Sequence, residues 1–228
     1  MRYIVVGLGY FGSSLSIRLT EMGHEVIAVD LNMHKVEQYK NRVTHTVSLD
    51  ASDIQSLSTL PIAETDIVIV GIGEDFGASV MATAIFKQLG AKRLMSRAIS
   101  PLHQTVLEAI GVHEIIRPEQ ESAERLAKKL EMRGVIDSFD LAEDYNIIEA
   151  TVPARYVGKT IAQSNFREKY QVNVLTILRH KESRNIFGNK QLKPSVLGVV
   201  SGDTIFEEGD ILVVFGKIQD IDRLLHER

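Results

Sequence analysis

The sequence YIVVGLGYFG at residues 3–12 joins an apolar run to three glycines, Gly7, Gly9 and Gly12. The apolar run predicts a buried strand and the segment after it predicts a helix, which is the context that a nucleotide-binding glycine turn requires. In such a turn Gly7 permits the sharp bend, Gly9 lets a phosphate approach the backbone, and Gly12 lets the helix pack closely on the strand. Unpaired amides at the helix start then face the phosphates. The segment predicts a Rossmann-type domain; the alternative is a glycine turn that holds no ligand.

An acidic residue stands at the end of the next strand. Residues 25–29 predict this strand, and Asp30 follows it directly. A carboxylate at this position accepts hydrogen bonds from the ribose hydroxyls of an adenine nucleotide. It also repels a 2′-phosphate, so NADP is disfavoured, whereas NAD, ATP, ADP and AMP remain open.

Strands and helices alternate as far as residue 132. Strands are expected at 3–6, 25–29, 44–49, 66–70, 92–96 and 113–116, and helices at 11–22, 33–39, 52–60, 76–89, 101–110 and 118–132. This alternation is typical of an α/β fold in which helices cover both faces of an open, doubly wound parallel sheet. We therefore expect a nucleotide-binding domain at residues 1–134.

The pattern changes after residue 134. Strands are expected at 146–152, 172–178, 204–206 and 211–215, with a closing helix at 218–225. Glycine-aspartate pairs at 202–203 and 209–210 mark turns. With less helix and more antiparallel sheet, residues 135–228 predict a second, smaller α+β domain.

Three more strand ends carry candidate binding residues, because the carboxyl ends of parallel strands meet at the ligand-binding edge. Asp50-Ala51-Ser52 follows the third strand, where Asp50 and the backbone after it can contact adenine. The other interpretation, compatible with the first, is that Asp50 or Ser52 caps the next helix. Gly71 follows the fourth strand and indicates a close approach of backbone to ligand. Arg97 follows the fifth and either reaches phosphates or forms a surface salt bridge.

The composition argues against several classes of function. The chain has 228 residues, a net charge of -4 and no cysteine, which gives no electrostatic reason to expect nucleic acid and allows no thiolate chemistry. No apolar run approaches the roughly 20 residues of a membrane-spanning helix, and the first residues lack the pattern of a secretory signal, so a cytoplasmic location is expected. No tyrosine is followed four residues later by lysine, and the 7 histidines show no metal-ligand spacing. A nucleotide site without catalytic partners favours a sensor over an enzyme.

Several segments closely resemble the RCK (or KTN) domains of bacterial potassium uptake systems, which pair a TrkA-N with a TrkA-C (RCK-C) domain. These are the glycine turn, MGHEV at 22–26, AVD at 28–30, DAS at 50–52, IIRPE at 115–119 and EEGDILVVFG at 207–216. The resemblance covers essentially the whole chain in one N-plus-C copy, as in Ktr-type gating subunits.

The resemblance implies a regulatory subunit without catalytic turnover. Subunits of this family form homodimers through the helix after the sixth strand, here about residues 119–132, and the dimers assemble into a ring, commonly an octamer. The ring docks on the cytoplasmic side of a KtrB- or TrkH-like potassium-translocating membrane subunit. ATP and ADP favour different ring shapes, and a ligand shifts such an equilibrium only by its differential affinity.

The resemblance also implies roles for single residues. Tyr10 and Phe11 lie within the phosphate turn, but Ktr-type relatives often have an arginine in place of Tyr10. Without the charge of that arginine, ADP, AMP and NAD(H) are expected as ligands beside ATP. Glu119 matches a glutamate that in some relatives helps bind a divalent cation at the dimer interface; the alternative is a favourable charge in the first helical turn. Arg167 and Asn173 resemble positions where some RCK-C dimers bind cyclic di-AMP; the alternative is a helix-to-strand corner.

Two other functions remain open from the residues alone. The first is a small NAD-dependent oxidoreductase whose second domain binds the substrate, which would transfer hydride. The second is a free-standing nucleotide sensor with a soluble partner, which would not co-purify with a membrane transporter.

Overall fold

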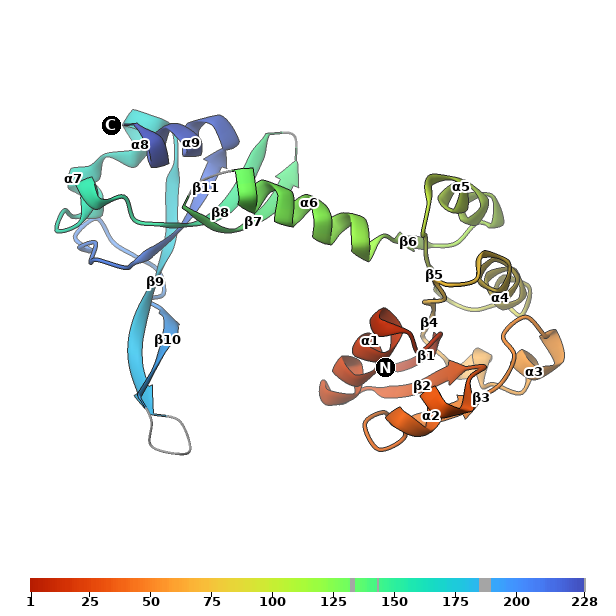
Figure 1. Ribbon diagram of the computed structural model, residues 1–228. Coiled ribbons are helices and arrows are strands. Elements are labelled where there is room, and N and C mark those ends of the chain that lie inside the picture. Colours follow the sequence, from red (N-terminus) through yellow and green to blue (C-terminus); the bar gives the residue numbers. More distant parts are fainter. Residues whose placement is uncertain (132–133, 143, 185–189, 228) are drawn as a thin grey trace. The chain divides into compact units, whose positions relative to one another are not determined.

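The computed structural model describes residues 1–131, 134–142, 144–184 and 190–227 (Figure 1). The chain divides into two compact units, Met1–Gln120 and Glu121–Arg228. Helix α6, Pro118–Glu131, begins in the first unit and continues in the second. The boundary expected at residue 134 would assign all of α6 to the first domain, and it stays a prediction. Within the described ranges, no helix is both long and apolar enough to cross a bilayer.

The first unit is built on a parallel sheet of six strands. They are β1 Arg2–Val6, β2 Glu25–Asp30, β3 His45–Ser48, β4 Ile67–Val70, β5 Leu94–Arg97 and β6 Glu114–Ile116. Their order in the sheet is β3-β2-β1-β4-β5-β6, with every neighbouring pair parallel. This confirms the doubly wound sheet. Because the order reverses between β1 and β4, the crevice at their carboxyl ends is where such sheets bind ligands.

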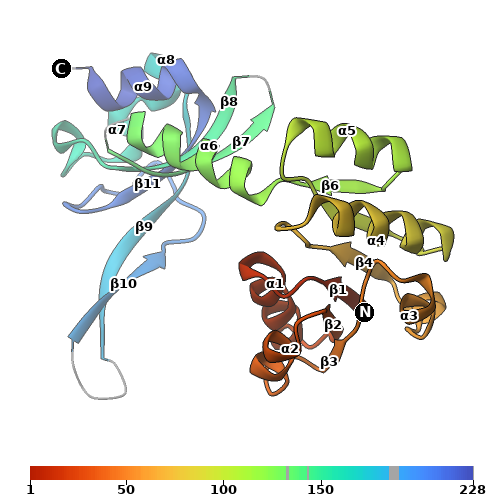
Figure 2. The ribbon, with the colours of Figure 1, turned by 45° about the vertical axis from the view of Figure 1, so that its right-hand side comes forward.

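Helices cover both faces of this sheet (Figure 2). They are α1 Tyr10–Glu21, α2 Met33–Tyr39, α3 Ile54–Ser58, α4 Phe76–Gln88 and α5 Pro101–Ile110, with a 3₁₀ turn at Ile62–Glu64. On one face Ile4 packs in a cluster with Leu57 of α3 and Phe86 of α4. On the other face Val5 packs in a cluster with Val36 of α2. Successive residues of a strand point to opposite faces, so a strand covered on both sides needs the unbroken apolar run seen in β1.

The second unit is built on an antiparallel sheet. Its strands are β7 Val135–Ala142, β8 Tyr145–Thr151, β9 Asn173–Arg184, β10 Lys190–Val196 and β11 Ile211–Lys217, in the order β10-β9-β11-β8-β7. Its helices are a 3₁₀ turn at Ala154–Tyr156, α7 Ile161–Ser164, α8 Phe166–Tyr170 and α9 Ile218–His226. Ile148, Val214, Tyr170 and Leu224 meet in its core.

The strand expected at 204–206 is wrong. Ile205 forms only an isolated bridge with Thr160. Conversely, β7 and β10 were not expected from the sequence. Both lie at the edges of the sheet, and edge strands tolerate charged residues and proline. β10 contains Pro194, so its sequence lacks the apolar pattern that predicts a strand.

Candidate nucleotide-binding site

The glycine turn connects β1 to α1 and leaves room beside its backbone. Gly7 has φ +95°, and a Cβ there would lie 3.0 Å from the Ile72 nitrogen. Gly9 is the N-cap of α1, and because glycine has no side chain it does not cap the first amides of the helix. A Cβ on Gly9 would meet nothing within 4 Å, so this position faces open space. The uncapped amides at the start of α1 can therefore donate hydrogen bonds to an anion.

Gly12 lies behind the turn and does not line the cleft described below. A Cβ on Gly12 would overlap the carbonyl oxygen of Gly7. Gly12 therefore acts on the site by letting α1 approach the backbone of the turn. Tyr10 lies at the cleft rim with 99% of its surface exposed.

Asp30 connects the glycine turn to the end of β2. Its Oδ2 accepts a hydrogen bond from the Leu8 amide at 2.7 Å, and its Oδ1 accepts one from the Asn32 amide at 2.8 Å. The Nζ of Lys35 lies 4.0 Å from Oδ2. Because each carboxylate oxygen can accept more than one hydrogen bond, acceptor capacity remains for ribose hydroxyls.

The turn after β3 carries Asp50, Ala51 and Ser52. The Asp50 carboxylate accepts hydrogen bonds from the Ser52 amide at 2.8 Å and the Ser52 hydroxyl at 2.6 Å. These bonds lower the pKa of Asp50, and the bond from the Ser52 hydroxyl has the larger effect. The helix cap expected at Asp50 or Ser52 is wrong: Asp53 is the N-cap of α3 and accepts from the Gln55 and Ser56 amides. The local Asx turn of Asp50 shifts the start of the helix by a few residues.

Arg97, at the end of β5, is packed against the glycine loop that follows β4. A Cβ on Gly73 would lie 2.5 Å from the Nη1 of Arg97. The same Nη1 donates to the Gly71 carbonyl oxygen at 3.4 Å, and the guanidinium carbon lies 5.9 Å from the centre of the Phe11 ring. Arg97 also forms an ion pair with Glu119 of α6. The structure therefore shows the salt bridge, and contact of Arg97 with phosphates stays a prediction.

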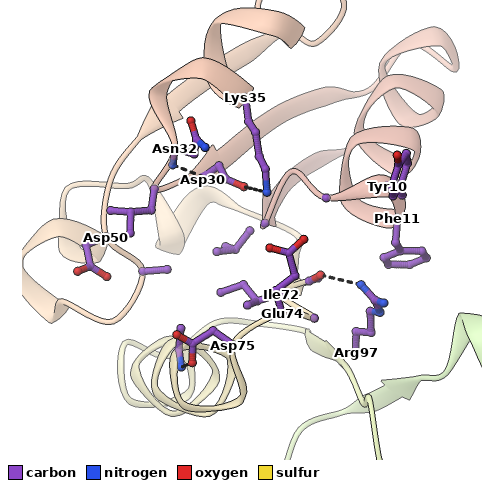
Figure 3. A pocket seen from close by; sticks show the side chains of 18 of the residues that line it. Tyr10, Phe11, Asp30, Asn32, Lys35, Asp50, Ile72, Glu74, Asp75 and Arg97 are labelled. Atoms are coloured by element: carbon purple, nitrogen blue, oxygen red, sulfur yellow. Dashed lines mark hydrogen bonds and ion pairs between the residues drawn. The ribbon is translucent and has the colours of Figure 1, made fainter.

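These elements enclose a cleft of about 710 Å³ (Figure 3). The volume lies within the range of about 300–1,000 Å³ usual for small-molecule sites. Of the predicted residues, the lining includes Gly7, Gly9, Tyr10, Phe11, Asp30, Asp50, Ala51, Gly71, Arg97 and Glu119, but neither Gly12 nor Ser52. Ile72 and Gly73, which follow Gly71 in the segment expected to approach the ligand, line it too. Residues not singled out from the sequence also line it: Val6, Leu31, Asn32, Lys35, Glu74, Asp75 and Ala78. Most of them follow β2 or β4 directly, so their positions after those strands could have indicated them.

Two family models match the chain: the TrkA-N domain over residues 3–118 and the TrkA-C domain over residues 147–227. The chain is 34% identical over 221 residues to the Ktr system potassium uptake protein C of Bacillus subtilis, covering 97% of this chain and 94% of that protein. It is also 34% identical over 226 residues to the Ktr system potassium uptake protein A of the same organism, covering 99% and 96%.

The chain belongs to the TrkA-N/TrkA-C family.

Solved structures agree with the fold of this TrkA-N/TrkA-C protein. The RCK domain of GsuK superposes with a TM-score of 0.64 at 16% identity, covering 99% of this chain and 47% of that one. A GsuK channel bound to NAD superposes with a TM-score of 0.63 at 16% identity, covering 98% and 38%. This chain thus spans less than half of each GsuK chain, and at this identity the likeness concerns the fold alone.

The remaining predicted residues lie outside this cleft, in the TrkA-C half of the chain. Arg167 is on α8 and Asn173 is the first residue of β9. Both are exposed, and Gln171, in the left-handed region at φ 58°, turns the chain between the two elements. The corner interpretation describes this geometry, and cyclic di-AMP binding stays a prediction. The divalent-cation role of Glu119 also stays a prediction: the part of the chain described by the structure contains no cluster of three or more histidine, cysteine, aspartate or glutamate side chains that could hold a metal.

Proposed function

We propose that this protein is an adenine-nucleotide-binding regulatory subunit of a potassium transporter. The observation that carries the proposal is the cleft at the ends of β1, β2 and β4, in which uncapped amides of α1 and the carboxylate of Asp30 face one space. Two Ktr system potassium uptake proteins of Bacillus subtilis are 34% identical to this chain over nearly their full length, which supports the proposal.

The ligand of the cleft is an adenine nucleotide with a free ribose: ADP, ATP, AMP or NAD(H). Asp30 accepts the ribose hydroxyls, and the first amides of α1 bind the phosphates. A GsuK channel has been solved with NAD, which supports a dinucleotide as one possibility. NADP is disfavoured, because the carboxylate of Asp30 repels its 2′-phosphate.

The protein acts by binding, without turnover. It forms a homodimer through α6, the dimers assemble into an octameric ring, and the ring docks at the cytoplasmic face of a potassium-translocating membrane subunit. Nucleotide binding changes the shape of the ring, and the shape opens or closes the pore. A divalent cation held by Glu119 and cyclic di-AMP held by Arg167 and Asn173 are further ligands to test.

Two measurements test this proposal. The nucleotide-stripped full chain is titrated calorimetrically with ATP, ADP, NAD, NADH, NADP and cyclic di-AMP, and we expect binding of the first four and none of NADP. Co-expression with the membrane subunit of a Ktr-type transporter is expected to give a complex that co-purifies and whose potassium flux depends on the nucleotide. Hydride transfer from NADH to a substrate, without such a complex, would instead favour the oxidoreductase.

A further inference from the structure

We propose that Glu119 competes with the phosphate groups of the ligand for Arg97. This ion pair would then set how strongly the cleft distinguishes phosphorylated from unphosphorylated adenine ligands. The inference rests on the proposed function and adds to it an autoinhibitory contact at the same cleft.

Arg97 is fixed next to the phosphate turn. Its guanidinium lies against Gly73, where a Cβ would come within 2.5 Å of Nη1, and near the ring of Phe11, the residue two places after Gly9 in the turn. Its side chain is 17% exposed. The guanidinium fills the space left by the missing side chain of Gly73, and Figure 3 shows Arg97 beside Phe11 of the turn, so its remaining N–H groups lie at the phosphate turn.

Glu119 occupies those N–H groups. Its Oε1 accepts from Nη2 of Arg97, and its Oε2 accepts from Nε at 3.3 Å. A guanidinium binds carboxylates and phosphates through the same planar pair of donors. The donors that would hold a phosphate are therefore already engaged by a carboxylate.

Two cations, Lys35 and Arg97, line the cleft beside the carboxylates of Asp30, Asp50, Glu74, Asp75 and Glu119, so the partner of each cation bears on phosphate binding. The residue after Gly9 is Tyr10, which brings no charge to the turn. The other cation among the lining residues is Lys35, whose Nζ lies 4.0 Å from Oδ2 of Asp30, the oxygen that accepts from the Leu8 amide of the turn. Lys35 is thus paired with a carboxylate inside the cleft, and Arg97, beside Phe11 of the turn, can meet a phosphate only when Glu119 releases it.

The competing carboxylate is easily released. The side chain of Glu119 is 61% exposed, so it regains water when it leaves Arg97. Glu119 is the second residue of α6, whose later residues belong to the second unit. A ligand that takes over Arg97 therefore changes the charge pairing at the start of the helix that leads into the TrkA-C half.

The test compares ADP with adenosine, two ligands that differ only in their phosphates. Wild type, Glu119→Gln and Glu121→Gln are titrated calorimetrically as nucleotide-stripped full chains, in EDTA and again with magnesium. Glu121→Gln is the matched control, because it removes the same charge from the same helix at an exposed residue outside the cleft lining. Thermal melting confirms that each variant is folded.

Glu119→Gln is expected to bind ADP about three- to five-fold more tightly than wild type in both buffers, the range of a partly exposed ion pair. Adenosine affinity is expected to change less than about two-fold in either variant, and Glu121→Gln is expected to match wild type. In an Arg97→Gln background, adding Glu119→Gln should give no further tightening of ADP binding.

An unchanged or weakened ADP affinity in Glu119→Gln would overturn the inference while leaving nucleotide binding itself in place. Weakening seen only with magnesium would assign Glu119 as a cation ligand and would equally overturn it. If wild type binds neither adenosine nor ADP, the proposed function fails, and the inference fails with it.

Discussion

Replacing Asp30 by alanine removes a carboxylate with two roles, one in folding and one in binding. The folding role is its hydrogen bonds to the amides of Leu8 and Asn32, at 2.7 and 2.8 Å. The binding role is the proposed acceptance of the ribose hydroxyls. The side chain of Asp30 is only 11% exposed, so water replaces the carboxylate poorly in the empty cleft.

The folding cost follows from the Leu8 amide. Leu8 is 2% exposed, and an unpaired buried donor costs about 1–3 kcal/mol. Asn32 is exposed, so its amide is rehydrated and adds little. We therefore expect Asp30→Ala to lower the unfolding free energy of the first unit by about 2 kcal/mol. Loss of the ribose contacts is expected to weaken ADP binding by a further 1–3 kcal/mol or so, roughly five- to 150-fold.

The two effects have separate assays. Hydrogen exchange of the β1 amides in the full chain reports the stability of the first unit without ligand. Calorimetric titration with ADP reports the affinity. Asp50→Ala is the control at the same cleft, because the Asp50 carboxylate accepts only local hydrogen bonds from Ser52 in the turn. Its loss of stability should be clearly smaller.

Each assay can refute its own part of the reasoning. If β1 exchanges at the wild-type rate in Asp30→Ala, the bond from the Leu8 amide does not stabilise the turn. If ADP affinity is unchanged, Asp30 is not the ribose acceptor, and the assignment of the cleft to an adenine nucleotide loses its main support.

Three further predictions concern other parts of the chain. Gly12→Ala should destabilise the first unit by about 3 kcal/mol or more and abolish ADP binding, because the added methyl group overlaps the Gly7 carbonyl oxygen. Thermal melting measures the stability and calorimetric titration measures the ADP affinity. A wild-type melting temperature would contradict the prediction. Burial lowers the pKa of His103, so the unfolded chain binds a proton that the folded chain does not, and the stability of the first unit should fall as pH falls below about 6.5. His103→Leu should flatten this dependence in hydrogen exchange measured over that range; an equally steep dependence in the variant would assign it to other groups. In the second unit, Arg179→Ala should lower the unfolding free energy by about 3 kcal/mol. Asp210 is 1% exposed, and the substitution removes the Nε and Nη2 donors that its carboxylate accepts from at 2.8 and 2.7 Å. Hydrogen exchange of the β11 amides measured as urea is raised reports this stability, and a decrease below about 1 kcal/mol would refute the prediction.

The sequence predicted the first unit well because its signals are local. The apolar run of β1, the glycines after it and the alternation that follows each depend on near neighbours in the chain, and the structure confirms the parallel sheet that they predict. The second unit was predicted less completely. β7 and β10 are edge strands, and their pairing depends on partners distant in the chain that a local pattern does not reveal.

The candidate site shows the same division. The predicted strand ends and the residue types placed Gly7, Gly9, Asp30 and Arg97 at one edge of a sheet, because parallel strands bring their carboxyl ends together. Only the tertiary structure decided what each side chain does there: that Asp30 also bonds the Leu8 amide, and that Glu119 takes the donors of Arg97. Hydrogen-bond partners far apart in the chain are chosen by distance and direction in space, and those follow from packing, which no spacing along the sequence encodes.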